Sequence, residues 1–161
     1  MSLVNNVTRL LDARKIPYTA YQLPPEKLGA VEAAQFMGVS PELVFKTIVI
    51  TREKPKKPIL AVVPGSAIVD LKTLAVFLGE KKVHLPTERE AEQLTGLQAG
   101  GISPLALINK GFQVVIDSAA QQYEQIYVSG GQRGLNIQLP VKDLVKLTNA
   151  RIASIAEEEN E

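Results

Sequence analysis

Apolar residues recur along this chain at two different spacings, one typical of helices and one typical of strands. Val4, Val7 and Leu11 lie three or four positions apart, which predicts an amphipathic helix over residues 3–14. Further along, the apolar residues form short unbroken runs rich in branched and aromatic side chains. Such runs, bounded by Gly, Pro and charged residues, predict strands.

Two of these runs are "VFKTIVIT" at 44–51 and "ILAVVP" at 59–64. The run at 44–51 has no polar face, so it is expected to be a central strand that is covered on both sides. The loop "REKPKKP" at 52–58 separates the two runs, and this spacing predicts a hairpin with a long loop.

The rest of the chain alternates between the two patterns. Further strands are expected at 16–23, 81–85, 112–118, 125–131 and 135–140. Further helices are expected at 30–37, 71–79, 87–95 and 141–155, with a short helical turn at 40–43. Gly38 suits a helix C-terminus, Asp70 suits an N-cap, and Thr87 with Glu90 has the spacing of a capping box.

Mixed strands and helices in this order indicate the α/β class. We expect one domain over residues 1–156, with a mixed, strongly curved and barrel-like sheet of about seven strands surrounded by about five helices. The acidic residues 157–161, "EEENE", are expected to form a flexible tail.

Composition narrows the possible chemistry. The chain has 161 residues, a net charge of +1, no cysteine and a single histidine, His84. Disulfides, thiolate metal sites, a cysteine nucleophile and a multi-histidine metal centre are therefore impossible. The N-terminal residues lack the apolar stretch of an export signal, and no apolar run is long enough to span a bilayer, so a cytoplasmic protein is expected.

Lys46 is the unusual residue of the strand at 44–51, because it places an ammonium group among apolar neighbours. One interpretation is that Lys46 lies near the strand end and extends its ammonium group to solvent. The other is that it lines a pocket and binds an anionic or carbonyl-bearing ligand.

Two glycine-rich segments are further candidates for a site. Gly100 and Gly101 in "AGGISPLAL" at 99–107 leave the backbone free for a tight turn or for presenting N–H groups to a carbonyl oxygen. The hairpin "YVSGGQRGLNI" at 127–137 contains Arg133, which could meet a phosphate or remain solvated.

Taken together, "VFKTIVI", "GGISPLAL" and "IYVSGGQRGLNIQL", in this order and spacing, resemble the YbaK/ProX family of aminoacyl-tRNA deacylases. They also resemble the editing domain inserted in bacterial prolyl-tRNA synthetases. The resemblance extends over nearly the whole chain. The residues of these motifs are most similar to those of the freestanding YbaK branch.

The resemblance implies a set of site residues. Lys46 would contact the terminal nucleotide of the substrate, and the glycine amides of the loop would position the ester carbonyl. The residues expected at the site from the matching motifs are Phe45, Lys46, Thr47, Gly100, Gly101, Ser103, Pro104, Ser129, Gly130 and Gly131.

This chain departs from the family pattern in three places. The YbaK branch carries a tyrosine at the end of its first strand, and Tyr21 is the tyrosine of this chain that lies closest to that position. Asn136 stands where the family often has Asp, so that it retains a hydrogen-bonding group without the charge. The loop at 24–30 differs in sequence from the loop that the YbaK branch usually has. That loop would contact the aminoacyl side chain, so the difference affects which amino acid the site would accept.

The function implied by the resemblance is hydrolysis of mischarged aminoacyl-tRNA, in particular of proline tRNA that carries cysteine. The substrate's own thiol would attack its ester, so that the enzyme needs neither a thiol nor a cofactor or metal. Removal of alanine by water, and a non-catalytic module that binds a tRNA end or a synthetase, are the alternatives. The implied partners are the 3′ end of aminoacyl-tRNA and prolyl-tRNA synthetase.

Overall fold

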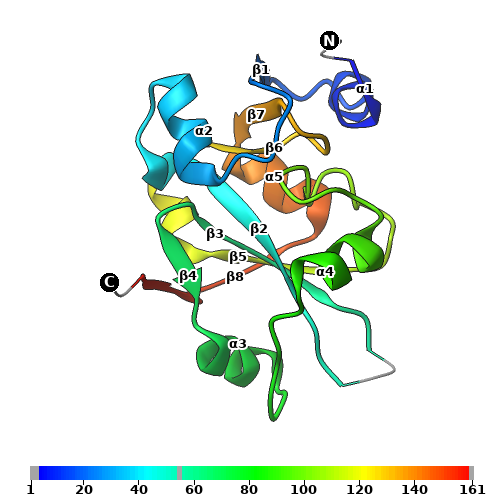
Figure 1. The fold of residues 1–161 in the computed structure, drawn as a ribbon, viewed down its shortest axis with the longest axis vertical. Coiled ribbons are helices and arrows are strands. Elements are labelled where there is room, and N and C mark those ends of the chain that lie inside the picture. Colours follow the sequence, from blue (N-terminus) through cyan, green and yellow to red (C-terminus); the bar gives the residue numbers. More distant parts are fainter. Residues whose placement is uncertain (1–3, 54–55, 160–161) are drawn as a thin grey trace.

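The fold is built from strands that pair over long distances in the chain, with short helices around them (Figure 1). The computed structural model describes residues 4–53 and 56–159. The helices in this part of the chain are α1 (Asn6–Ala13), α2 (Ala30–Met37), α3 (Leu71–Leu78), α4 (Glu88–Thr95) and α5 (Val141–Thr148), with short 3-10 helices at Pro41–Leu43 and Ser118–Gln122. The expected number of five α-helices is confirmed for the described residues.

The strands in the described residues are β1 (Thr19–Gln22), β2 (Phe45–Ile50), β3 (Ile59–Pro64), β4 (Ala67–Val69), β5 (Gln113–Asp117), β6 (Gln125–Ser129), β7 (Leu135–Pro140), β8 (Arg151–Ala153) and β9 (Ala156–Glu158). They form a four-stranded sheet in the order β2-β3-β5-β8, a three-stranded sheet in the order β1-β7-β6, and the pair β4-β9.

The four-stranded sheet contains the predicted hairpin. Strands β2 and β3 are antiparallel, with Lys46 opposite Val63 and Thr47 opposite Val62. Strand β5 then joins β3 in parallel, and β8 joins β5 in parallel. All six residues of β3 are buried. Strand β2 instead lies at the end of the strand order of this sheet, and three of its six residues are only partly buried, so the expectation of a central strand covered on both sides over 44–51 was wrong.

The single, strongly curved sheet of about seven strands was not the right description. The nine described strands fall into three sheets, and the order of strands in each is open-ended. A parallel bridge joins Val44, the residue just before β2, to Tyr127 of β6, and thus links the two larger sheets.

Helix boundaries follow the capping residues. Gly38 ends α2 in the left-handed region, with φ of 69°, and the Asp70 side chain accepts from the Thr73 N–H at the start of α3. Thr87 and Glu90 form the predicted capping box of α4. These ends could be predicted because each depends on one local hydrogen bond or one backbone conformation.

The C-terminal part of the chain was predicted wrongly. The helix expected over 141–155 ends at Thr148, because Asn149 adopts the left-handed conformation with φ of 53°. The chain then pairs with β5 as strand β8. Glu157 and Glu158, assigned to a flexible tail, lie in β9, which pairs with β4 at the left of Figure 1.

Another error concerns residues 81–85, where a strand was expected. This segment makes only one bridge, between His84 and Thr51. Parts of three further assignments lie outside the described residues: the start of the first helix at residue 3, loop residues 54–55, and tail residues 160–161.

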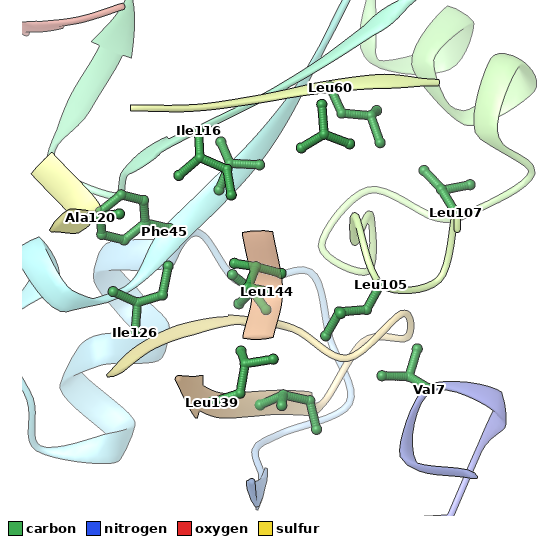
Figure 2. Close-up of a cluster of buried hydrophobic side chains, with 14 of the residues drawn as sticks. Val7, Phe45, Leu60, Leu105, Leu107, Ile116, Ala120, Ile126, Leu139 and Leu144 are labelled. Carbon is green, nitrogen blue, oxygen red and sulfur yellow. The ribbon is translucent and has the colours of Figure 1, made fainter. Parts of the chain in front are cut away.

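The main core lies between the two larger sheets. Figure 2 shows Leu60 and Ile116 of the four-stranded sheet and Ile126 and Leu139 of the three-stranded sheet pointing toward one another around Leu144 of α5. A second cluster covers the other face of the four-stranded sheet, where Leu74 of α3 packs against Ile59 and its neighbours. No helix in the described residues is long and apolar enough to cross a membrane.

Candidate active site

An open cleft of about 590 Å³ lies beside β2, and several of the expected site residues line it. One wall is formed by β2 itself, from Phe45 to Val49, and another by the loop before α2, from Lys27 to Gly29. The start of α4 contributes Glu88, and the glycine-rich loop contributes Gly100. The expected residues that line the cleft are Phe45, Lys46, Thr47, Gly100, Ser129 and Asn136.

Lys46 is positioned by the β2–β3 hairpin. Its Nζ donates to the carbonyl oxygen of Gly65, just beyond β3, at 3.3 Å. Partial burial lowers the pKa of the Lys46 ammonium below its ordinary value, and the negative charge of Glu159 opposes that shift. Lys46 therefore forms part of the cleft wall with its ammonium group only partly buried, a position from which it can meet both solvent and a ligand in the cleft.

Two buried oxygens in the cleft wall have no hydrogen-bond partner within the described residues. They are Oγ1 of Thr47, on β2, and Oδ1 of Asn136, on β7. Asn136 is a buried residue with an exposed fraction of only 8%. Leaving such groups unpaired costs free energy, so these two oxygens are acceptors in the cleft wall that water or a ligand can satisfy.

Asn136 belongs to a row of paired residues across the three-stranded sheet. It lies opposite Tyr21 on β1 and opposite Ser129 on β6, so the three side chains emerge on one face of the sheet. Tyr21 does not line the cleft. Its ring packs against Tyr127 with centroids 5.6 Å apart, and its hydroxyl donates to Oε1 of Gln138.

Gly100 and Gly101 of the glycine-rich loop have different structural roles. Gly100 is exposed, lines the cleft and has φ of 88°, and its N–H makes no hydrogen bond within the described residues. Gly101 is buried and donates its N–H to the carbonyl oxygen of Gln98 at 2.8 Å. Gly100 is therefore the glycine with a free donor, while Gly101 closes a turn.

Close packing against the neighbouring hairpin explains why position 101 needs glycine. A Cβ at Gly101 would lie 2.9 Å from Cα of Gln132. From the same hairpin, Nε of Arg133 donates to the carbonyl oxygen of Ala99 at 2.7 Å. Arg133 thus holds the glycine-rich loop in place, which is neither of the two roles considered from the sequence.

Four other expected residues lie behind the cleft surface. Ser103 is fully buried, and its Oγ accepts from the Leu105 N–H. The Gly130 N–H donates to Leu135, and a Cβ at Gly130 would lie 2.5 Å from Cγ of that leucine. Pro104 and Gly131 are likewise absent from the cleft lining, so these residues support the loop and hairpin.

The sequence analysis missed three residues that shape the cleft. Lys27 and Glu88 both line it and form an ion pair across it, with Nζ 2.6 Å from Oε2. Gly65 provides the acceptor for Lys46, and a Cβ there would lie 2.6 Å from Cβ of Ala30. The "PG" pair at the end of β3, of which Pro64 is the last strand residue, was a usable sign for Gly65. Nothing in the sequence connects Lys27 to Glu88.

Residues 24–147 match the family described as "Aminoacyl-tRNA editing domain". The chain belongs to this family. It is therefore an aminoacyl-tRNA editing deacylase of the YbaK/ProX type, as the motifs suggested, and its substrate class is aminoacyl-tRNA.

Two related proteins support this family assignment, and they align with different lengths of the chain. The chain is 36% identical over 156 residues to EbsC of Enterococcus faecalis, named as a proposed Cys-tRNA(Pro)/Cys-tRNA(Cys) deacylase, covering 96% of this chain and 94% of that protein. It is 28% identical over 109 residues to the proline–tRNA ligase of Thermodesulfovibrio yellowstonii, covering 68% of this chain and 18% of the ligase.

A solved structure extends the comparison to the fold. A protein titled as a proposed trans-editing enzyme for prolyl tRNA synthetase superposes with a TM-score of 0.79 at 26% identity, covering 99% of this chain and all of that one. The fold of the YbaK/ProX family is thus present along the full described chain.

Proposed function

We propose that this editing deacylase removes cysteine from mischarged proline tRNA, and that the thiol of the substrate is the nucleophile. The observation that carries the proposal is the cleft: it holds one half-buried cation, Lys46, and two unpaired oxygens, but no hydroxyl placed next to a free base. The name of the E. faecalis relative supports the same amino acid.

The groups in the cleft wall are poorly suited to activating a nucleophile of the protein. The Ser129 Oγ accepts from the Gly131 N–H, and Thr47 Oγ1 has no partner that could remove its proton. Glu88 is paired with Lys27, and Glu32 caps α2 by accepting from the Gly29 N–H. The chain has no cysteine. A site of this kind accelerates a reaction mainly by positioning and by polarising the carbonyl.

In the proposed reaction, the cysteine sulfur attacks the ester carbonyl carbon of the same aminoacyl group. A C–S bond forms, the bond between that carbon and the ribose oxygen breaks, and the proton of the thiol ends on the ribose oxygen. The products are free tRNA and a cyclic thioester, which water then opens to cysteine. No oxidant or reductant is required.

Each lining group has a place in this scheme. The Lys46 ammonium would bind a phosphate or ribose oxygen of the terminal nucleotide, and the free N–H of Gly100 would donate to the ester carbonyl oxygen. Oδ1 of Asn136 would accept from the α-ammonium group of the cysteine, which an amide can do without a charge. Thr47 Oγ1 would donate to or accept from the same end of the substrate.

We further propose that prolyl-tRNA synthetase is the partner that delivers the mischarged tRNA. This rests on the similarity to a short portion of a proline–tRNA ligase, which indicates that related editing domains exist both within a synthetase and as separate chains. The net charge of +1 gives this chain little general attraction for a tRNA body, so selection by a second protein is reasonable.

The test is a deacylation time course with proline tRNA charged with cysteine or, separately, with alanine. We expect loss of cysteine only, and we expect Lys46→Ala to abolish it while the circular dichroism spectrum stays unchanged. Lys82→Ala, outside the cleft, is the matched control. Loss of alanine instead would replace the thiol mechanism by attack of water, and binding without turnover of either substrate would support a non-catalytic module.

A further inference from the structure

A second hollow lies directly beside the cleft and is not used by the proposed reaction. This side groove, of about 610 Å³, is lined by Lys46, Ile48, Ile68, Val69, Asp70, Leu71, Lys72, Leu85 and Glu157. Lys46, Ile48 and Leu85 line the cleft as well. The two hollows therefore meet at Lys46.

The walls of the groove are mostly apolar, so a flat ligand in it would make mostly apolar contacts. Leu85 is exposed to 62% and Ile68 to 36%, although both are large apolar side chains. They come from different parts of the fold: Leu85 follows the His84 bridge, and Ile68 lies in β4. Exposed apolar side chains gathered in a hollow indicate a binding surface.

A free carboxylate lies next to this apolar surface. Glu157 of β9 is opposite Ile68 of β4, so the two side chains lie on one face of the pair, and both line the groove. The Glu157 carboxylate makes no hydrogen bond or ion pair within the described residues. Asp70, the other carboxylate, is occupied by the Thr73 N–H at the start of α3.

This combination suits a nucleobase that carries an exocyclic amino group. Apolar walls contact the faces of the ring, and a carboxylate accepts from the amino group, as it does from amino groups of bases in nucleic-acid complexes. A phosphate is favoured at Lys46, where the groove meets the cleft, and the charge of Lys72 opposes that of Asp70 on the groove wall, so Glu157 is the carboxylate left for an amino group.

Building on the proposed function, we propose that the side groove binds the terminal adenine of the tRNA 3′ end, with the 6-amino group of the base donating to Glu157. The ester is carried by the ribose of that same nucleotide. An aminoacyl group in the cleft therefore brings its own adenine to the junction at Lys46, and the groove is the adjoining space.

The test uses nucleotides without an ester, so that it is independent of catalysis. Adenosine 5′-monophosphate (AMP) and inosine 5′-monophosphate (IMP) are titrated into the ¹⁵N-labelled protein and followed by NMR. IMP replaces the amino group by an oxygen, which the carboxylate repels. We expect AMP to bind at least about tenfold more tightly, with shifts at Ile68, Val69 and Glu157.

Glu157→Ala should remove this preference for AMP, whereas Glu158→Ala should retain it. Glu158 is the matched control because it lies opposite Ala67 and does not line the groove. Ile68→Ala should weaken both nucleotides severalfold, and Val76→Ala, at an 81% exposed apolar residue outside the groove, should leave both unchanged.

Equal binding of AMP and IMP, equal effects of the two glutamate variants, or no saturable binding would overturn the proposal. With mischarged tRNA, Glu157→Ala should raise KM and leave kcat unchanged. Failure of the cysteine assignment would appear differently, as wild-type protein that binds AMP but does not release cysteine.

Discussion

Nζ of Lys46 lies 3.3 Å from the carbonyl oxygen of Gly65 and donates to it across the end of the β2–β3 hairpin. A neutral carbonyl compensates an ammonium group less than a carboxylate does. The side chain is thus held in position at the cleft while much of its charge remains available to an anionic ligand. Burial without a directly paired carboxylate is the reason that its pKa is lowered.

We predict that the Lys46 ammonium titrates below its ordinary pKa of 10.5 and that Glu159→Gln lowers its pKa further. The sign follows from charge: Glu159 favours the protonated form, so removing its charge favours the neutral amine. The measurement is the pH dependence of the lysine ¹³Cε shift, assigned with Lys46→Arg. An unchanged or higher pKa in Glu159→Gln would contradict this account.

The same shift makes a prediction for stability. Because the folded-state pKa of Lys46 is lowered, the unfolded chain binds more protons in the window between the lowered pKa and 10.5. The contribution of Lys46 to stability therefore improves as the pH rises through that window. Lys46→Met should be more stable than the wild type near neutral pH, and thermal unfolding at pH 7 and 10 should show this advantage shrinking.

Thr47→Val should stabilise the protein and weaken its activity. The substitution removes a buried hydroxyl that has no partner in the described residues, so we expect a gain of about 1 kcal/mol and a rise in Tm of roughly 2–4 °C. Deacylation should fall roughly 2- to 10-fold, because one hydrogen bond to the substrate is lost.

Thr51→Val is the matched control for that experiment. The Thr51 hydroxyl donates to the carbonyl oxygen of His84 at 3.2 Å, so its removal should lower Tm and leave deacylation unchanged. If both valine variants lowered Tm, the hydroxyl of Thr47 would have to be satisfied within the protein.

Gly101→Ala should reduce stability and activity together. The new Cβ would lie 2.9 Å from Cα and 3.0 Å from the carbonyl carbon of Gln132, and backbone atoms cannot move away as a flexible side chain can. We expect a loss of about 1–3 kcal/mol by overpacking. Gly29→Ala, whose Cβ would meet only Glu32 Oε1 at 3.6 Å, should fold normally. Chemical denaturation compares the two.

Asp117→Asn should loosen the C-terminal strands. Oδ1 of Asp117 accepts from the N–H groups of Ile155 and Ala156, and Oδ2 accepts from the Ala119 N–H. An amide there turns one acceptor into a donor facing N–H groups, which should cost about 1–3 kcal/mol. Hydrogen exchange at β4 and β9 should accelerate, whereas Asp143→Asn should change neither exchange nor Tm appreciably.

The elements that could be predicted from the sequence are those fixed by nearby residues. The capping residues Gly38, Asp70 and Thr87 could be predicted because each makes its interaction within a few positions. The hairpin of β2 and β3 was also predicted, since its two apolar runs are separated by a single polar loop. Strands β8 and β9 were missed because distant partners, β5 and β4, decide their conformation against the helical spacing of the sequence.

The site was predicted unevenly for a similar reason. Lys46 stood out because a charged residue within an apolar run is unusual, and Asn136 stood out by its motif. Which glycine has a free N–H, 100 or 101, depends on the turn to Gln98, and only the structure shows that turn. The pairing of Lys27 with Glu88 joins segments with no common pattern.

The sheet that carries Asn136 also affects the order of events in folding. Among the strands that the structure describes, β1 pairs only with β7, so Thr19 must find Gln138 before the row of Tyr21, Asn136 and Ser129 exists. Contacts between such distant residues form slowly, because a long loop must close first. A nascent chain that has not yet exposed β7 therefore contains Lys46 but lacks the row of side chains from the three-stranded sheet beside it.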